Sequence, residues 1–370
     1  MSKKTKVLFL LEGFDKGGIE KVTLDIVNNL DPEKYDITVQ TFWFGGHCQS
    51  QVKPHVKVIP FFFRRYVRGV IRLIDYLSPK MLYRLFVHGD YDVEIACSDG
   101  GAAKVISGST NTHARKVCWV HMDVVQRGSK LKEFTNADTA RPIYSKFDVI
   151  APVSEACKEN FVKKFGSDYP YWVVRNPMPV PDILAKADAF HPDFPHHRTN
   201  FVCVGRLVEQ KGFDRLLQAA ARVKAACNVP FHIYIVGEGH KRPELEADIR
   251  TLGLDDEVTL LGFCENPYPY LKHADVFLLS SRDESFSLVV GESLIVGTPA
   301  IATNCSGISE WLDNNRYGLI LENSTEGIFE GMVRVLENPD LLTQFRSRIP
   351  EAQQAISFEK GLQDFEKIMR

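Results

Sequence analysis

Two carboxylates eight positions apart, Glu284 and Glu292, lie where a short apolar run gives way to an apolar helical pattern. Glu284 follows the run directly and Glu292 falls about one turn into the expected helix, so both side chains can face one pocket beside the helix start. A carboxylate orients a sugar because it accepts several hydroxyl donors, and free N–H groups near Ser287 and Leu288 suit a phosphate. The pattern therefore predicts a sugar-nucleotide site. The alternative is a solvated helix start with two acidic residues.

Two cations stand at another strand exit, in the run 205–212. Arg206 and Lys211 lie five positions apart on a loop that leads into the next helix. Both charges, together with the helix N-terminus, suit a diphosphate. Lysine and arginine are also common on solvated loops, which is the alternative interpretation.

One acidic pair, Asp90 and Asp92, resembles the metal-binding D-x-D motif of some sugar transferases. It precedes its strand and therefore falls at the amino end of the sheet, away from the edge where ligands bind. We therefore expect no metal, and we expect Arg206, Lys211 and the helix dipole to neutralise the leaving diphosphate.

The N-terminal part of the chain carries a glycine loop and a histidine at strand exits. Gly17 and Gly18 lie between the apolar run 7–11 and a helical pattern, so the backbone could approach an anion closely. Their spacing is not that of a dinucleotide-binding loop, and a plain turn is the alternative. His121 ends the strand expected at 116–120, on the edge where such sheets bind ligands, although a lone histidine is more often structural.

These residues depend on a scaffold of continuous apolar runs that alternate with amphipathic helical patterns, as in parallel sheets covered on both faces. The strands expected are 7–11, 37–42, 56–60, 93–97, 116–120 and 149–152, then 201–204, 231–236, 258–261, 276–279 and 300–303. The clearest helices expected are 19–30, 214–227, 242–252 and 288–296. Three prolines within 176–181 predict an extended linker. We therefore expect two doubly wound α/β domains with a crevice between them.

Length and composition limit the class of protein. The 370 residues, 44% hydrophobic and 25% charged, are ordinary for a soluble globular chain. The net charge of −2 argues against a dedicated nucleic-acid binder. Eight scattered cysteines favour reduced thiols in a cytosolic protein. No run reaches the roughly 18 apolar residues of a membrane span, and the first apolar run is too short for a signal peptide.

The net charge conceals an asymmetry between the two parts of the chain. Residues 1–180 carry 26 Lys and Arg against 19 Asp and Glu, a net charge of +7, and the remaining residues carry −9. The basic excess includes Arg65, Arg68 and Arg72, which fall on one face of a helix expected within 61–73. Such a basic amphipathic segment suits an anionic membrane surface. The alternatives are an ordinary solvated helix face and, for the asymmetry, sampling noise.

Four motifs, taken together in this order and spacing, resemble one family. They are Gly17-Gly18-x-Glu20, G-R-L-x-x-x-K-G at 205–212, Gly237-Glu238-Gly239, and the E-x7-E pair Glu284 and Glu292. Over essentially its whole length the chain resembles the retaining glycosyltransferases of the GT-B fold, family 4 in the usual classification. The resemblance implies two Rossmann-like, doubly wound domains facing across a crevice. The acceptor-binding domain would span 1–176, with the C-terminal helix 356–370 packing back on it, and the donor-binding domain 182–355.

The resemblance also implies roles for single residues. Glu284 would hold the donor sugar, Glu292 the ribose, and the two cations the diphosphate. The catalytic residues implied are His121, Arg206, Lys211 and Glu284. The donor-binding residues implied are Gly17, Gly18, Gly237, Phe263, Cys264, Phe286, Ser287, Leu288 and Glu292. Two departures, Ser285 and Pro177, stand where relatives often have glycine, which would alter the pocket and stiffen the hinge.

The expected activity is transfer of a hexose or N-acetylhexosamine from a UDP-sugar, with retention and without a metal or cofactor. The acceptor would be a lipid-linked glycan of bacterial surface polysaccharide synthesis. The partners would be a nucleotide sugar, this acceptor and an anionic membrane surface, but no nucleic acid, and the protein would sit in the cytoplasm against the inner face of the cell membrane. The alternatives are a GDP-sugar mannosyltransferase, a sugar-nucleotide epimerase and a non-catalytic sugar-nucleotide-binding protein.

Overall fold

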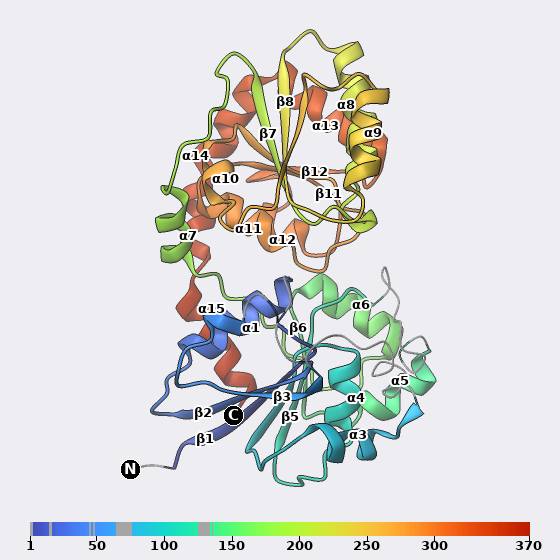
Figure 1. Ribbon diagram of the computed structural model, residues 1–370, viewed down its shortest axis with the longest axis vertical. Helices are drawn as coiled ribbons and strands as arrows, with labels where there is room; N and C mark the ends of the chain where they lie inside the picture. Colours follow the sequence, from blue (N-terminus) through green and yellow to red (C-terminus); the bar gives the residue numbers. More distant parts are fainter. Residues whose placement is uncertain are drawn as a thin grey trace. The chain divides into compact units, whose positions relative to one another are not determined.

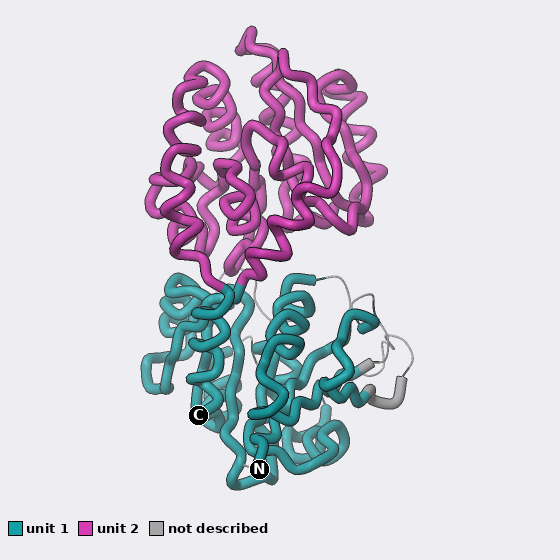
Figure 2. The backbone as a smooth tube through the Cα atoms, turned by 90° about the vertical axis from the view of Figure 1, so that its left-hand side faces the viewer, with its two compact units in different colours: residues 1–177, 358–370 teal, residues 178–357 magenta. Residues whose placement is uncertain are grey.

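The computed structural model of the chain describes residues 3–14, 17–43, 46, 49–63, 76–124, 134 and 136–370. The chain divides into two compact units, coloured separately in Figure 2: residues 1–177 together with 358–370, and residues 178–357. In each unit, helices cover both faces of one parallel sheet (Figure 1). Each sheet has its own apolar core.

The first unit is built on a parallel sheet that, within the described residues, has six strands in the order β3-β2-β1-β4-β5-β6. The strands are β1 (Thr5–Leu11), β2 (Tyr35–Trp43), β3 (Lys57–Phe63), β4 (Val93–Ala96), β5 (Arg115–Val120) and β6 (Val149–Pro152). The helices are α1 (Gly18–Asn29), α3 (Pro79–Phe86), α4 (Gly101–Ser107), α5 (Ala137–Tyr144), α6 (Glu155–Phe165) and α15 (Phe358–Ile368), with a short 3-10 turn at Gln49–Gln51. Continuous apolar strands such as β1 form because both faces of the sheet are buried.

The C-terminal helix α15 completes the core of the first unit. Phe365 of this helix is fully buried, and its ring stacks on Phe9 of β1 with 5.9 Å between centroids. It also meets Trp119 of β5 edge-on at 4.9 Å. The Arg115 Nε donates to the Ile368 carbonyl at 2.8 Å. The last residues of the chain are therefore part of the unit that contains the first residues.

The second unit repeats the same architecture. Its sheet, over the residues that the structure describes, has the order β12-β11-β10-β7-β8-β9. The strands are β7 (Thr199–Val204), β8 (Phe231–Val236), β9 (Val258–Gly262), β10 (Val276–Leu279), β11 (Ala300–Thr303) and β12 (Gly318–Leu321). The helices are α7 (Val180–Ala187), α8 (Phe213–Ala226), α9 (Arg242–Thr251), α10 (Tyr268–His273), α11 (Leu288–Ile295), α12 (Ile308–Leu312), α13 (Thr325–Glu337) and α14 (Pro339–Ala355), with a 3-10 turn at Glu209–Lys211.

Numbered within each unit, the strand order of both sheets is 3-2-1-4-5-6, which is the order of doubly wound nucleotide-binding folds. The predicted α/β class with two doubly wound parallel sheets is confirmed. All of the expected strands form, and β6, β8, β10 and β11 have the predicted bounds. The strand β12 and the helices α7, α13 and α14 are not among the elements expected from the sequence.

Two local predictions are wrong. The strand β3 continues to Phe63, so residues 61–63 belong to the sheet and not to a basic amphipathic helix. The linker ends earlier than expected because Val180 and Pro181 open α7. A proline is tolerated in the first turn of a helix, where its missing N–H would have no intrahelical partner in any case.

Candidate functional site at the switch point of the second sheet

The strands β7 and β10 are neighbours in the second sheet, although they are separated in sequence. Their connections lead to opposite sides of the sheet, so the loops after them diverge at their carboxyl ends. This switch point is where open α/β sheets bind ligands. The loop 205–212 follows β7, and the loop 280–287 follows β10.

The structure brings Lys211 and Glu284 together at this point. Lys211 Nζ lies 2.6 Å from Glu284 Oε1, and the two side chains are only 16% and 11% exposed. The Ser281 hydroxyl donates to the same carboxylate oxygen at 2.6 Å. The site therefore holds a largely desolvated ion pair, and the motifs in the sequence do not reveal the hydrogen bond from Ser281.

Gly212 allows the two loops to approach closely. Its φ of +64° lies in the left-handed region, which favours glycine. A Cβ at this position would collide with the carbonyl oxygen of Ser280. The glycine is therefore required both for its backbone conformation and for the space it leaves to the facing loop.

Several hydrogen bonds fasten the two loops to each other. The Arg282 N–H donates to the Gln210 carbonyl at 2.8 Å, and the Gln210 amide donates to the Asp283 carbonyl at 2.8 Å. The Ser280 hydroxyl donates to the Lys211 carbonyl at 2.8 Å. The cation and the carboxylate are thus held by a common framework, although they are distant in sequence.

The helix α11 places the second carboxylate of the E-x7-E pair. Glu292 is 4% exposed, and the Tyr268 hydroxyl donates to its Oε1 at 3.3 Å. Ser287 is the N-cap of this helix and Leu288 its first residue. The first backbone N–H groups of a helix lack intrahelical partners and attract anions. A phosphate beside Ser287 would therefore meet favourable donors, and Tyr268 is a further candidate that the spacing of the acidic pair did not reveal.

Phe286 supports the start of α11 from inside the unit. Its buried ring stacks on Trp311 of α12, with 4.6 Å between centroids. A Cβ at Gly291 would meet the same indole. The structure thus gives Phe286 a packing contact, whereas the prediction assigns it to donor binding.

The remaining predicted residues of the second unit lie on the loops that follow β7, β8 and β9. Arg206 is exposed, and its side chain makes no hydrogen bond or ion pair with the part of the chain that the structure describes. Gly237 has a φ of +156°, and a Cβ there would collide with the Gly205 carbonyl. Phe263 is 51% exposed after β9, and the neighbouring Cys264 thiol donates to the Asn266 carbonyl at 3.1 Å.

His121 lies at the carboxyl end of β5 in the first unit. It is 8% exposed, and its ring centroid lies 4.1 Å from that of Trp119. Its Nε2 is buried without a hydrogen-bond partner among the described residues. Burial lowers the pKa of His121 from 6.5 to about 3, so the imidazole is neutral at physiological pH.

The glycine loop of the first unit opens α1. Gly17 is the N-cap and Gly18 the first helical residue. A Cβ at Gly17 would collide with the Glu20 carboxylate, which therefore lies against the helix start. A side chain at position 17 would therefore require the Glu20 carboxylate to move, while the backbone at Gly17, with a φ of −146°, would accept other residues.

The acidic pair Asp90 and Asp92 is engaged in local contacts before β4. Asp92 accepts from the Lys6 N–H at 2.8 Å, and Asp90 lies 3.4 Å from His113 Nε2. The predicted membrane-facing residues Arg65, Arg68 and Arg72 lie outside the described residues.

The family match to known proteins lies within the second unit. Residues 198–338 match the family "Glycosyl transferases group 1". This region includes all four of the residues that the sequence predicts for the diphosphate, sugar and ribose, namely Arg206, Lys211, Glu284 and Glu292.

Two curated relatives are similar to the chain. One is the N-acetylgalactosamine-N,N'-diacetylbacillosaminyl-diphospho-undecaprenol 4-alpha-N-acetylgalactosaminyltransferase of Campylobacter jejuni, 32% identical over 209 residues, which make up 56% of this chain and 55% of the relative. The other is an uncharacterized glycosyltransferase of Haemophilus influenzae, 23% identical over 98% of both chains. The chain thus spans about half the length of the first relative and nearly all of the second.

Solved structures share the fold over the whole chain. The crystal structure of Anabaena HepE in complex with UDP and glucose aligns with a TM-score of 0.78 at 18% identity, covering 98% of both chains. At this identity the likeness shows the fold, which is GT-B as the sequence predicts, and not the activity.

Proposed function

We propose that this protein transfers a sugar from a nucleotide-sugar donor to a glycan acceptor. The observation that carries the proposal is the pairing of Lys211 Nζ with Glu284 Oε1, 2.6 Å apart at the β7–β10 switch point. This pair lies inside the region similar to Glycosyl transferases group 1. A cation beside a carboxylate is the arrangement that a diphosphate linked to a sugar requires, because each end of the donor meets its complement.

The proposed contacts follow from the chemistry of each group. Lys211 and Arg206 bind the diphosphate, and Glu284 accepts hydrogen bonds from the sugar hydroxyls. Glu292 accepts from the ribose, and the start of α11 offers N–H groups to a phosphate. Because Lys211 and Glu284 are paired with each other in the structure, donor entry exchanges one ion pair for two sets of donor contacts.

The reaction we propose breaks the bond between the anomeric carbon and the phosphate oxygen. Positive charge develops on the sugar, while the cations stabilise the charge of the departing diphosphate. The acceptor oxygen attacks from the face that the leaving group occupied, and the leaving phosphate takes its proton, which gives retention without a protein nucleophile. No metal or cofactor takes part in this scheme. The roles of His121, Gly17, Gly18, Gly237, Phe263, Cys264 and Phe286 rest on the family resemblance.

The donor proposed is a UDP-sugar that carries a hexose or N-acetylhexosamine, and the acceptor a lipid-linked glycan of bacterial surface polysaccharide. The UDP and glucose in the HepE structure support the donor class. The diphospho-undecaprenol in the name of the Campylobacter relative supports the acceptor class. Both are properties of those proteins, and we transfer them to this chain by similarity.

A lipid-linked acceptor places the reaction at a membrane surface, which we propose is the inner face of the cell membrane. None of the described helices is both long and apolar enough to cross a membrane. The proposed contact is therefore peripheral, through Arg65, Arg68 and Arg72, and it rests on the sequence alone. Co-sedimentation with anionic vesicles at low and high salt tests it, and failure to bind at low salt would refute it.

The decisive experiment for the activity has two steps. A thermal-shift screen of UDP, GDP, ADP and their sugars identifies the donor, because a ligand at a hundredfold excess over its Kd stabilises the protein by about 2.7 kcal/mol. Transfer is then assayed with the bound donor and an undecaprenyl-diphosphate-linked glycan. Donor turnover that requires the acceptor supports the proposal. Donor epimerisation without an acceptor, or binding without turnover, would contradict it.

A further inference from the structure

We infer that Arg215 is a positioning residue that sets the geometry of the Lys211–Glu284 pair from beneath the two loops. This inference rests on the proposed function, since it concerns how the proposed donor site is held in shape. Arg215 belongs to α8 and is 7% exposed. It lies outside the four motifs of the family resemblance.

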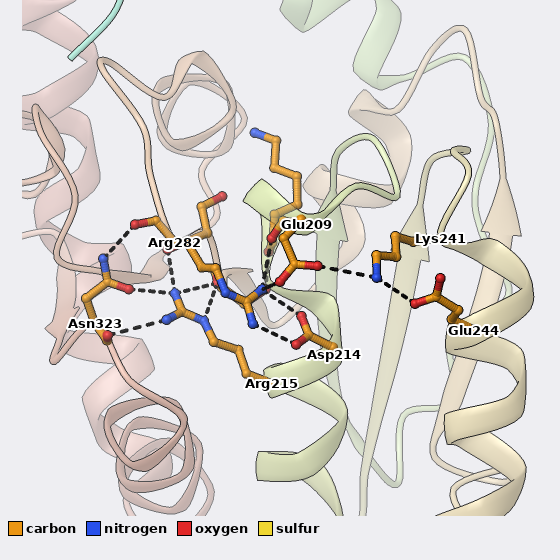
Figure 3. Close-up of polar contacts among 10 residues, drawn as sticks. Glu209, Asp214, Arg215, Lys241, Glu244, Arg282 and Asn323 are labelled. Atoms are coloured by element: carbon orange, nitrogen blue, oxygen red, sulfur yellow. Dashed lines mark hydrogen bonds and ion pairs between the residues drawn. The ribbon is translucent and has the colours of Figure 1, made fainter. Parts of the chain in front are cut away.

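The guanidinium of Arg215 binds the start of the loop after β10. Its Nε and Nη2 both donate to the Ser280 carbonyl, at 2.9 and 2.8 Å, and Nη2 also donates to the Ser281 carbonyl at 2.6 Å. On its other side Nη2 donates to Asn323 Oδ1 at 2.6 Å and Nη1 to the Asn323 carbonyl at 3.3 Å. Figure 3 shows this fork reaching from α8 toward Asn323 and the segment that carries Arg282.

The acceptors of these five hydrogen bonds are neutral oxygens. Burying a cation that has no carboxylate partner costs desolvation energy. An apolar side chain in the same place would not have this cost. Packing alone therefore gives no reason for an arginine here. The planar guanidinium binds two successive carbonyls, those of Ser280 and Ser281, and so determines the position of the loop that leads to Glu284. This is a reason for an arginine at position 215.

The two serines whose carbonyls Arg215 binds contact the Glu284 carboxylate and the backbone of Lys211. Ser281, whose carbonyl it binds, donates through its hydroxyl to Glu284 Oε1 at 2.6 Å. Ser280, whose carbonyl it also binds, donates through its hydroxyl to the Lys211 carbonyl at 2.8 Å. Arg215 is thus linked through Ser281 to the Glu284 carboxylate and through Ser280 to the backbone of Lys211.

A second guanidinium, that of Arg282, also fixes the segment 280–282 in place. Arg282 donates to both carboxylate oxygens of Asp214, at 2.7 and 2.6 Å, and to the Glu209 carbonyl at 2.9 Å. The Asn323 amide donates to the Arg282 carbonyl at 3.0 Å. Arg215 and Arg282 therefore hold adjacent parts of the segment 280–282 against α8 and against Asn323 in the loop after β12 (Figure 3).

The test is a double-mutant cycle on kcat/KM for sugar transfer. Arg215→Met removes the fork, and because a displacement of about 1 Å can cost roughly a hundredfold in rate, we expect a loss of that order, mainly in kcat. If Arg215 acts through Glu284, the double variant R215M/E284Q falls no more than about threefold below E284Q alone. Arg215→Lys retains one donor to the carbonyls and should recover part of the lost kcat.

The matched control is Arg222→Met on the same helix. Arg222 also forms a two-pronged ion pair, with Glu326 at 2.7 and 2.9 Å, but it is remote from the loops. We expect its kcat/KM to stay within about twofold of the wild type, as is usual for an exposed pair. If R215M does not fold, R215K and R215K/E284Q form the cycle instead.

Three outcomes decide between the inference and the proposed function. Non-additive losses, with a partial recovery in R215K and no loss in R222M, support the inference. Additive losses, or R215K and R215M with wild-type kcat, would overturn it while the wild type still transfers sugar. A wild type that binds and turns over no donor overturns the proposed function and the inference with it.

Discussion

The Lys211–Glu284 pair has a structural and a functional effect that substitutions can separate. Either Lys211→Met or Glu284→Gln alone leaves a largely buried charge unpaired, so we expect each to lower the free energy of unfolding by about 3–5 kcal/mol. The double variant K211M/E284Q removes both charges and should regain most of this stability. Transfer should remain reduced about a hundredfold or more, since the groups proposed to bind the donor are gone. Urea unfolding and a transfer assay measure the two effects.

A control for this comparison is Lys224→Met, which breaks an ion pair with Glu257 at 2.8 Å. Lys224 is 42% exposed, so the loss should stay within about 1 kcal/mol and transfer should be unaffected. A double variant K211M/E284Q that transfers sugar at the wild-type rate would show that the pair serves folding alone.

The buried imidazole of His121 makes a prediction about pH. Its pKa is lowered by burial to about 3, so the folded protein leaves it neutral where the unfolded chain, with a pKa near 6.5, takes up a proton. Above about pH 6.5 the imidazole is neutral in both states, and the free energy of unfolding is at its full value. As the pH falls from 6.5 toward 3, only the unfolded chain takes up the proton, so the free energy of unfolding decreases. Between pH 7.5 and 5 this single group should cost about 2 kcal/mol of the free energy of unfolding.

Substitution of His121 by Phe, which preserves a ring against Trp119, removes this titration. The variant should therefore lose less stability than the wild type when urea unfolding is repeated at pH 5. His88→Gln is the control, because it removes an exposed histidine from the same unit. Equal pH slopes for His121→Phe and the wild type would contradict a buried neutral imidazole.

Gly212 shows how one backbone position joins two elements. Gly212→Ala forces a side chain into the left-handed region and against the Ser280 carbonyl. Gly253→Ala is a close control, because Gly253 has the same φ of +64° but open space around it. We expect Gly253→Ala to lower the free energy of unfolding by about 1 kcal/mol. Gly212→Ala should lower it by about 2–3 kcal/mol more than Gly253→Ala does, and should also clearly reduce transfer. Similar losses in both variants, by thermal unfolding and by activity, would show that the loops can separate without consequence.

The elements were largely predictable from the sequence, because local patterns determine them. Continuous apolar runs predicted the strands on both sides of the site, including β10 with its bounds. The apolar run 276–279 and the helical pattern after it predicted that Glu284 follows a strand and that Glu292 lies on the next helix. The pairing of Lys211 with Glu284 depends on β7 lying beside β10, and strand order is a property of the whole sheet. Local periodicity does not encode it.

The supporting residues were missed for the same reason. Arg215 reads in the sequence as an ordinary polar residue of an amphipathic helix, and only the folded unit shows that it faces the carbonyls of another loop. Tyr268 reads as one of several aromatics, yet its hydroxyl reaches Glu292. Conversely, the motif position of Phe286 suggested donor binding, whereas its ring packs on Trp311.

At the scale of the whole molecule, the chain begins and ends in the same unit. The opposite net charges of the two parts of the sequence fit two units with different partners, and the basic first part suits the proposed membrane-bound acceptor. The return of α15 to the first unit means that a fragment ending near residue 177 lacks part of its own core. Stability of the first unit therefore depends in part on a helix that follows the second unit in the sequence.

This dependence can be tested at Phe365, which is fully buried against Phe9 and Trp119. Phe365→Ala removes both ring contacts and leaves a cavity, so we expect the first unit to lose about 3–5 kcal/mol of its free energy of unfolding. Calorimetry should show that loss in the transition of the first unit, with the nucleotide-dependent stabilisation of the second unit retained. Phe190→Ala, at a side chain that is 37% exposed, should change either transition by less than about 1 kcal/mol. A Phe365→Ala protein that melts like the wild type would mean that α15 is dispensable for the first unit, and the truncated chain would then be expected to fold without it.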